Sequence, residues 1–210
     1  DRYLKSQELP LFWQTLQVEP DQDFRDFVLL SLLAGAREGN NLAMRYEDID
    51  FDTATWRVPG EKSKNGDPLI IVLVPEALEI LARRRAESLS PWVFPAARVS
   101  AAKAALSDPG PRTAFRRRWR RFRIEAGVPD LNVHDLRRSL GSWQARTGAS
   151  LLIIGKTLGH KSAQATQIYA RLDTDPVRDA VERATSTMLA VARGESAEIR
   201  KLERSGPKRA

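Results

Sequence analysis

The second half of the chain consists almost wholly of helix-forming segments separated by short breaks, which limits the folds open to it. Five such segments follow one another, at 111–126, 134–147, 150–158, 161–171 and 176–193. The first half predicts four more helices, over 6–17, 21–34, 40–49 and 75–88. We expect Ser6 to cap the first of these four and Gly35 to end the second. Such a chain folds as a mainly helical domain.

One part of the chain predicts β structure. Residues 54–60 and 68–74 read as strands, and the loop between them, 61–67, is rich in turn-forming residues. Asn65-Gly66 within that loop is a strong hairpin signal. We therefore expect a mainly α fold with a small antiparallel β-sheet, that is, an α+β fold.

The length suits one domain. A chain of 210 residues can bury about 70% of its unfolded surface, so its core needs no disulfide or metal to support it. The sequence contains no internal repeat. We expect a single domain over 1–193, followed by a polar and flexible tail over 194–210.

The composition excludes several classes of protein. The chain has no cysteine, which rules out disulfides, thiolate metal sites and thiol nucleophiles. No apolar stretch reaches the length of a membrane span, and residues 1–20 lack the features of a signal peptide. No group of Asp, Glu and His resembles a metal site. We expect a cytoplasmic protein without membrane association, metal or other cofactor.

The net charge of +7 favours a polyanionic partner, and its distribution points to one segment. Residues 116–123 contain six arginines with two aromatic residues between them. On a helix, one face carries Arg116, Arg120 and Arg123, and another carries Phe115, Trp119 and Phe122. The basic face can be a solvated helix surface or a contact with the DNA backbone. Both interpretations are compatible with packing of the aromatic face.

The two histidines of the chain, His134 and His160, fall in one short window that ends at Tyr169. Arg137 follows His134 by three residues and therefore lies beside it on a helix. Imidazole exchanges protons near neutral pH, guanidinium binds phosphate oxygens, and a phenol can act as a nucleophile. Together these groups suit chemistry on a phosphodiester.

Each of these residues also has a structural interpretation. The helix that carries His134 and Arg137 places its apolar residues on the opposite face, at Leu136, Leu140 and Trp143. We expect the polar pair to point out of the core, with Gly141 leaving room on its side for something large. The pair alone could be an exposed helical face without a role. Tyr169 alone could be a core residue with its hydroxyl at the surface.

Taken together, these motifs resemble the catalytic domain of the tyrosine recombinases, the phage integrase family. An arginine, a His-x-x-Arg pair, a Leu-Gly-His triplet and a tyrosine nine residues further on follow in the family's order. The segment LLAGAREGNNLAMRYEDIDF is similar to the family's first arginine segment, with Arg37 as the catalytic arginine. The segment WRVPGEKSKNGDPLIIVLV is similar to the hairpin that bears the catalytic lysine. The resemblance covers about residues 3–185.

The resemblance implies a role for each residue. Arg37 and Arg137 clamp the non-bridging oxygens of the scissile phosphate, and His160 adds a third donor. His134 assists proton transfer at the nucleophile. Tyr169 attacks in line and forms a 3′-phosphotyrosyl intermediate. Because that intermediate conserves the energy of the phosphodiester, rejoining needs no ATP. The fixed cationic charge of the site makes a metal unnecessary.

Two positions leave alternatives open. Lys64 is the preferred proton donor to the departing 5′-oxygen, and Lys62 is the alternative, since both flank the hairpin turn. Asn40 stands where the family commonly has an acidic residue; it can orient an arginine or histidine by hydrogen bonding but cannot balance charge. Glu38 could substitute for it.

The resemblance also implies partners. We expect double-stranded DNA to contact Arg116, Arg120 and Arg123, with Arg138 and Lys161 as further contacts beside catalytic positions. The full-length protein is expected to act as a homotetramer on DNA in a bacterial cell, with accessory DNA-bending or directionality proteins as further partners. We expect the family's separate DNA-gripping domain to lie outside this segment, and we therefore expect the segment alone to bind DNA weakly.

Three hypotheses follow for function. The first is a site-specific recombinase or integrase of a prophage or other mobile element. The second is a type IB topoisomerase-like enzyme, and the third is a non-catalytic DNA-binding regulator derived from a recombinase. The helix over 176–193 can dock onto a neighbouring subunit or pack within its own chain, and the sequence favours neither.

Overall fold

The computed structural model describes residues 2–60, 68–96, 108–160, 162–170, 181–182 and 184–189. The chain divides into two compact units, Asp1–Leu172 and Asp173–Ala210. In the second unit, residues 181–182 and 184–189 are helical, within the helix expected over 176–193. Several expectations lie outside the described residues, namely those for Lys62, Lys64, Asn65-Gly66, Lys161 and the tail 194–210.

Two helices open the first unit, α1 (Leu9–Val18) and α2 (Gln22–Ala34). Asp21 caps α2 by accepting a hydrogen bond from the backbone N–H of Phe24, and Gly35 ends it with φ 59°. The cap at Ser6 is wrong, because α1 begins three residues later and has no side-chain cap. A cap at Ser6 would place Pro10 beyond the first turn, where the missing proline N–H would break a helical hydrogen bond.

The helix expected over 40–49 is also wrong. The chain forms α3 (Glu38–Leu42), leaves the helix at Ala43 and makes a single 3-10 turn, η1 (Tyr46–Asp48). The N–H of Tyr46 donates to the carbonyl of Pro91 at 3.0 Å. This long-range bond takes the donor that a continuing helix would have used.

The sheet has three strands, β1 (Ile49–Asp50), β2 (Thr55–Val58) and β3 (Leu69–Val72), in the order β1-β2-β3 and antiparallel throughout. Strands β2 and β3 were predicted and are confirmed, whereas β1 was not anticipated. Trp56 pairs with Ile71 in the β2–β3 register, and both side chains are buried. Helix α4 (Pro75–Glu87) follows the sheet directly.

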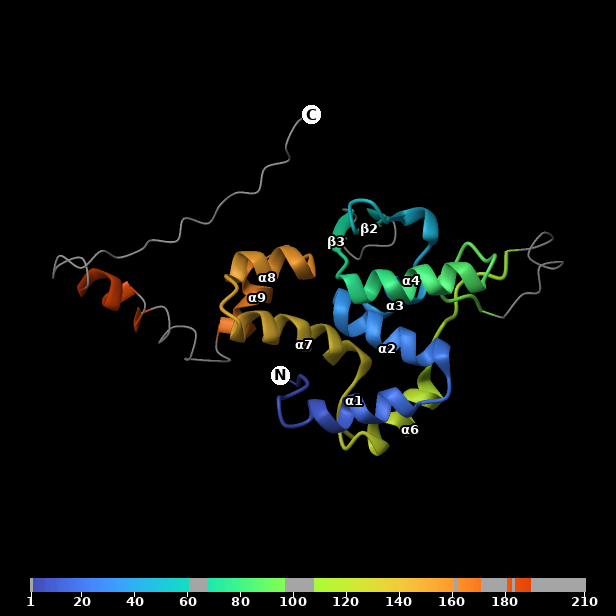
Figure 1. The fold of residues 1–210 in the computed structure, drawn as a ribbon, viewed down its shortest axis with the longest axis horizontal. Helices are drawn as coiled ribbons and strands as arrows, with labels where there is room; N and C mark the ends of the chain where they lie inside the picture. Colours follow the sequence, from blue (N-terminus) through green and yellow to red (C-terminus); the bar gives the residue numbers. More distant parts are fainter. Residues whose placement is uncertain are drawn as a thin grey trace, which may run out of the picture. The chain divides into compact units, whose positions relative to one another are not determined.

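Four further helices lie in the described part of this unit, and they are α6 (Arg116–Glu125), α7 (Val133–Arg146), α8 (Leu151–Leu158) and α9 (Ala163–Ala170). All four confirm predicted helices, although α6 starts later than expected. The N–H of Arg112 donates to Phe94 O at 2.8 Å instead of entering a helix. Figure 1 shows the sheet at one end of the unit and the pair α1 and α6 at the other, with α2 and α7 between them.

The core explains this arrangement. Trp119 and Phe122 on α6 are buried as predicted, and Phe122 packs edge-on against Phe12 of α1, with ring centroids 5.1 Å apart. Phe24 of α2 contacts both α6 aromatics. A second, smaller apolar cluster joins α8 and α9 and consists of Ile154, Leu158 and Tyr169. Tyr169 therefore packs in this second cluster and not in the main core.

Candidate active site

Arg37 enters the site from the end of α2. Gly35 reverses the chain in the left-handed conformation, and Arg37 follows at the N-cap of α3 in extended backbone. Its side chain is half-buried, and within the described part of the chain it forms no hydrogen bond or ion pair. The guanidinium of Arg37 is therefore available to a ligand.

Arg137 contradicts the expectation that the polar pair on α7 points out of the core. Its side chain is buried, and its Nη1 donates to the carbonyl of Gly35 at 2.5 Å. Its Nη2 donates to the carbonyl of Leu158. Those carbonyls lie at the ends of α2 and α8, where a helix leaves its last C=O groups without internal partners. Arg137 thus joins two helix ends and retains further N–H donors for another acceptor.

The electrostatic environment of Arg137 is unusual for an arginine. Burial and, to a smaller extent, the positive charge of Arg37 lower its pKa to about 10, while Tyr169 acts in the opposite direction. At neutral pH the group keeps its charge. Two neighbouring guanidinium groups, one buried and one half-buried, favour binding of an anion between them.

His134 lies in the first turn of α7 and is accessible to solvent. This turn is fixed by a capping box, in which the Asp135 carboxylate accepts from the N–H of Asn132 at 2.8 Å. Partial desolvation lowers the pKa of His134, and the charges of Arg138 and Arg137 add to the effect. The imidazole is consequently neutral at pH 7 and able to accept a proton.

His160 directly follows the end of α8. Gly159 takes the left-handed conformation, and the N–H of His160 donates to Gly155 O at 2.9 Å, which completes a Schellman motif. The ring Nδ1 lies 3.0 Å from Oγ1 of Thr166. Burial lowers the pKa of His160, and Arg137 and Arg37 lower it further.

Tyr169 lies against this histidine. The two rings are nearly parallel, at 13°, with centroids 6.3 Å apart. The tyrosine ring occupies the space beside Gly141, where an added Cβ would lie 2.7 Å from Cζ. The expectation that Gly141 leaves room for a large group is confirmed, and the group is the tyrosine ring itself. Burial raises the pKa of the phenol, an effect that Arg137 and Arg138 oppose.

The structure therefore brings five of the six expected catalytic residues together: Arg37, His134, Arg137, His160 and Tyr169. The sixth, Lys64, lies outside the described residues. Asn40 is buried, but in the described part of the chain it makes no hydrogen bond to an arginine or a histidine. Its neighbour Asn41 instead donates to Ser31 Oγ at 2.7 Å, which anchors α3 to α2.

The expected DNA-contacting residues divide into two groups. Arg116 and Arg120 are exposed on α6, and neither forms an ion pair with the described residues. Arg123 is half-buried and donates to Leu131 O at 3.4 Å. On α7, Arg138 pairs with Asp135 at 2.9 Å. On α6, the exposed arginines that pair with none of the described acidic groups are thus Arg116, Arg120 and also Arg117, which was not singled out from the sequence.

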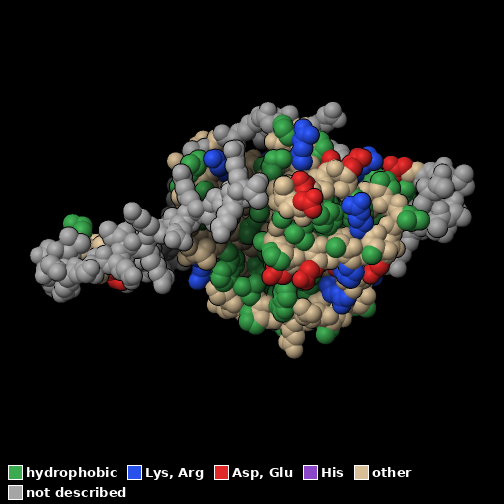
Figure 2. All heavy atoms as spheres, turned by 45° about the horizontal axis from the view of Figure 1, so that its top comes forward, with side chains coloured by type: hydrophobic (Ala, Val, Ile, Leu, Met, Phe, Trp, Pro, Cys, Tyr) green, Lys and Arg blue, Asp and Glu red, His purple; other side chains and the backbone are tan. Residues whose placement is uncertain are grey.

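Two other arginines of the same helix pair with acidic groups, the half-buried Arg118 and the exposed Arg121. Arg118 pairs with Glu19 at 2.7 Å and with Asp21 at 2.8 Å, and Arg121 pairs with Glu19 at 3.2 Å. The Glu19 side chain is buried, so these pairs join α6 to the end of α1. On the face drawn in Figure 2, acidic and basic side chains are intermixed, and apolar side chains gather in a hollow.

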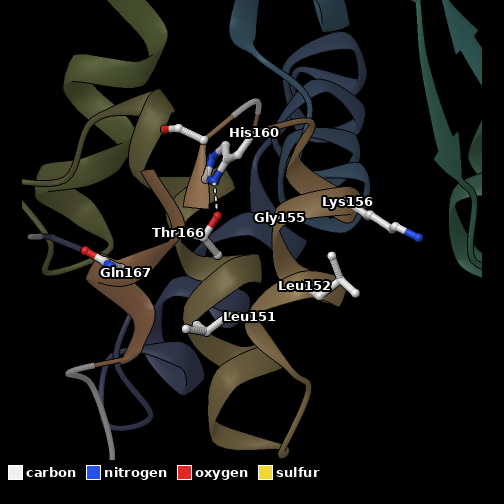
Figure 3. Close-up of a pocket in the computed structure, with 8 residues that line it drawn as sticks. Leu151, Leu152, Gly155, Lys156, His160, Thr166 and Gln167 are labelled. Atoms are coloured by element: carbon white, nitrogen blue, oxygen red, sulfur yellow. Dashed lines mark hydrogen bonds between the residues drawn. The ribbon is translucent and has the colours of Figure 1, made fainter. Parts of the chain in front are cut away.

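A pocket of about 370 Å³ opens beside His160 (Figure 3). Its lining comes from α8, from α9 and from two residues between these helices, and consists of Leu151, Leu152, Gly155, Lys156, His160, Ser162, Thr166 and Gln167. Thr166 is a residue that sequence reasoning missed. Its position three residues before Tyr169 places both on one face of α9, which is the signal that could have found it.

Among the described residues, no group of three or more His, Cys, Asp or Glu side chains could hold a metal ion. None of their helices is long and apolar enough to cross a bilayer.

A mainly helical unit with a three-stranded sheet, which gathers two arginines, two histidines and a tyrosine, defines the catalytic domain of a tyrosine recombinase. The family model agrees: residues 2–175 match the phage integrase family, and the chain belongs to it.

Similar proteins include a tyrosine recombinase and a putative integrase. A tyrosine recombinase XerA of Pyrococcus furiosus is 32% identical over 173 residues, which are 80% of this chain and 58% of the relative. A putative integrase/recombinase, y4rA, of Sinorhizobium fredii is 31% identical over 156 residues, which are 73% of this chain and 37% of the relative. The chain thus spans only about a third to somewhat more than half of these relatives.

Solved structures share the fold. The crystal structure of XerA recombinase matches with a TM-score of 0.64 at 20% identity, covering 88% of this chain and 65% of the other. The catalytic domain of bacteriophage HP1 integrase matches with a TM-score of 0.60 at 15% identity, covering 86% of this chain and 93% of the other. The second match shows that this fold makes up nearly the whole of an integrase catalytic domain.

Proposed function

We propose that this chain is the catalytic part of a site-specific DNA recombinase that cleaves and rejoins DNA for integration or excision of a mobile element. The observation that carries the proposal is the packing of Tyr169 beside His160 and within the field of Arg137. A nucleophile, an imidazole and a buried cation in contact suit attack on a phosphodiester.

In the proposed reaction the phenol oxygen of Tyr169 forms a bond to phosphorus while the bond from phosphorus to the 5′-oxygen breaks. The free guanidinium of Arg37 and the remaining donors of Arg137 hold the non-bridging oxygens. His134, which is neutral and accessible, takes the phenol proton. Lys64 supplies a proton to the departing 5′-oxygen. Reversal of these steps by another 5′-hydroxyl rejoins the DNA.

A base is needed because burial raises the pKa of the Tyr169 phenol above its ordinary value near 10. At neutral pH the phenol is almost wholly protonated, so its proton must leave as the attack proceeds. The clustered positive charge lowers the cost of the developing phenolate and of the doubly charged transition state.

The proposed partner is double-stranded DNA, contacted by Arg116 and Arg120, with Arg123, Arg138 and Lys161 as further contacts. Structures of relatives support this partner. XerH recombinase is described bound to its difH substrate, and the Tn1549 transposon integrase in complex with transposon right end DNA. For the complete protein we propose a homotetramer on DNA, assisted by accessory DNA-bending or directionality proteins, in the bacterial cytoplasm.

The domain assignment is part of the same proposal. Residues 1–193 form the catalytic domain, and 194–210 form a polar tail. A DNA-gripping domain, carried elsewhere in the full protein, completes the clamp on DNA.

Covalent capture tests the proposal. The chain is incubated with a pool of nicked DNA duplexes whose sequence is randomised around the nick, so that cleavage releases a short strand and traps the adduct. We expect a covalent protein–DNA adduct in which the 3′ end of the cleaved strand is joined through its phosphate to Tyr169. Sequencing of the trapped DNA then identifies the site. Tyr169→Phe abolishes the adduct, whereas Tyr3→Phe, a substitution of a partly buried tyrosine in another part of the domain, leaves it unchanged.

Three results contradict the proposal. Adduct at equal yield from Tyr169→Phe removes Tyr169 from its role. Binding without any adduct favours a non-catalytic regulator. Relaxation of supercoiled DNA without exchange between two duplexes that carry the recovered site favours a type IB topoisomerase-like enzyme.

A further inference from the structure

Thr166 contacts the candidate active site without any role assigned above. Its side chain is buried, and Oγ1 lies 3.0 Å from Nδ1 of His160, the bond drawn dashed in Figure 3. It precedes Tyr169 by three residues, so α9 presents the hydroxyl and the tyrosine ring to the same histidine.

The hydroxyl of Thr166 differs from those of other helical threonines. Three of them donate to the carbonyl four residues earlier, at distances of 2.6 to 3.0 Å, and these are Thr15, Thr157 and Thr185. Thr166 makes no such bond to a described residue, and its hydroxyl meets His160 instead. The Thr166 hydroxyl thus bonds to an imidazole nitrogen in place of the backbone carbonyl that the other three threonines use.

The direction of the bond follows from the surroundings. A buried hydroxyl hydrogen needs an acceptor, since an unpaired one costs free energy. Among the described residues, Nδ1 of His160 is the one hydrogen-bond partner of Thr166 Oγ1. The hydroxyl therefore donates, and Nδ1 accepts. A neutral imidazole that accepts at Nδ1 carries its hydrogen on Nε2.

The backbone around the pair is arranged to keep this contact. A Cβ added at Gly155 would lie 3.1 Å from Thr166 Oγ1, so the glycine leaves space for the hydroxyl. The carbonyl of the same residue accepts the N–H of His160, which fixes the backbone of the histidine. Gly155 thus serves both partners, although a glycine inside a helix costs about 1 kcal/mol relative to alanine.

We propose that Thr166 is a positioning residue for His160: by donating to Nδ1, it holds the neutral ring with its hydrogen on Nε2, so that the ring offers an N–H donor to the scissile phosphate. The donation to phosphate rests on the proposed function, whereas the choice of tautomer does not. Burial lowers the pKa of His160, and Arg137, Arg37 and His134 lower it further, so its surroundings favour the neutral ring.

The tautomer can be measured without DNA. In the ¹⁵N-labelled chain, long-range ¹H–¹⁵N correlation spectra at pH 7.5 separate protonated from unprotonated ring nitrogens, and the chain has only two histidines to assign. We expect His160 to carry its hydrogen on Nε2 in the native chain and in Thr166→Ser. In Thr166→Val we expect both tautomers of His160 to be populated and to interconvert. A hydrogen on Nδ1 in the native chain overturns the proposal, as does a Thr166→Val spectrum equal to the native one.

The consequence for catalysis is tested by the rate of adduct formation under single-turnover conditions. Loss of one neutral hydrogen bond predicts a rate about tenfold lower for Thr166→Val, with DNA affinity within about twofold of native. Thr166→Ser should restore the rate to within about threefold. Thr15→Val is the matched control, because it removes an exposed hydroxyl whose one bond to a described residue is to Leu11 O.

The outcomes separate this proposal from the proposed function. If the native chain forms no adduct, the proposed function fails, and the tautomer spectra alone decide the role of Thr166. If adduct forms and Thr166→Val reacts at the native rate, the positioning role is wrong and the recombinase chemistry stands. Should Thr166→Val fail to fold, the native spectrum and the Thr166→Ser rate still decide.

Discussion

The ring of Tyr169 occupies the space that Gly141 leaves on α7: a Cβ at that glycine would lie 2.7 Å from Cζ of the tyrosine and 2.9 Å from Cδ1 of Leu158. The absence of a side chain at Gly141 on α7 thus leaves the space in which the Tyr169 ring packs. Any residue larger than glycine at position 141 must displace the ring or the helix that carries it.

Gly141→Ala should therefore cost activity more than stability. Overpacking destabilises by about 1–3 kcal/mol, partly offset by roughly 1 kcal/mol from the better helix propensity of alanine. Adduct formation should fall at least tenfold, because the displaced phenol loses its alignment. Urea unfolding and trapping of adduct on nicked DNA give the two quantities. Gly39→Ala is the stability control, since an added Cβ there meets nothing within 4 Å; equal effects at both glycines would contradict the packing argument.

Arg137→Lys should lose most of the activity although it keeps the charge. A lysine ammonium cannot reproduce the fork that reaches both Gly35 O and Leu158 O, so one helix end loses its donor. The loss of a fixed donor to the transition state predicts a rate about a hundredfold lower. Single-turnover adduct formation measures it, and an unchanged melting curve would show that the two carbonyl bonds contribute nothing to stability.

Stability should increase with pH below neutrality because of His160. Burial and Arg137 lower its folded pKa below the ordinary 6.5, so the unfolded state binds more protons. The stabilisation is complete above pH 6.5 and is lost as the pH falls from there through the folded pKa. His160→Gln should flatten this part of the curve of unfolding free energy against pH. A curve of unchanged slope in that variant would reject the lowered pKa.

DNA affinity should depend on the exposed arginines of α6 more than on the paired ones. Arg116→Ala and Arg120→Ala should each reduce the slope of log K against log salt by about 1, because each exposed charge releases about one counterion. Arg123→Ala should change it less, since that side chain is half-buried against Leu131 O. Fluorescence anisotropy over a salt series measures the slopes. Equal slopes for all three variants would show that the exposed arginines contribute no more to DNA binding than the half-buried Arg123.

Arg118→Ala should instead lower stability. It leaves the buried Glu19 carboxylate with one arginine partner fewer, although Arg121 and the N–H of Asp21 remain. We expect a loss of about 1 kcal/mol in the free energy of unfolding. Arg117→Ala, at an exposed neighbour on the same helix, provides the control, and a similar loss there would speak against the role of Glu19.

Much of this site could be predicted from the sequence because its signals are local. The His-x-x-Arg spacing, the Gly-His break after α8 and the tyrosine nine residues later each depend on a few neighbouring residues. The orientation of Arg137 could not be predicted in this way. Its acceptors lie 102 and 21 residues away in the chain and become neighbours only when α2, α7 and α8 pack.

The errors in the fold have the same origin. The helix expected over 40–49 ends early because Tyr46 bonds to Pro91, a contact between distant segments. Strand β1 has only two residues and forms through its register with β2, so no periodicity reveals it. The late start of α1, by contrast, could have been predicted from the sequence, because Pro10 fits only the first turn of a helix.

The bonds of Arg137 to two helix ends bear on how such a chain can evolve. A descendant that no longer cuts DNA would still need this arginine to fold, so purifying selection would keep it. Arg37, which bonds to none of the described residues, would then be free to drift. In a comparison of diverging copies, an intact Arg37 is therefore the better sign that selection still acts on chemistry.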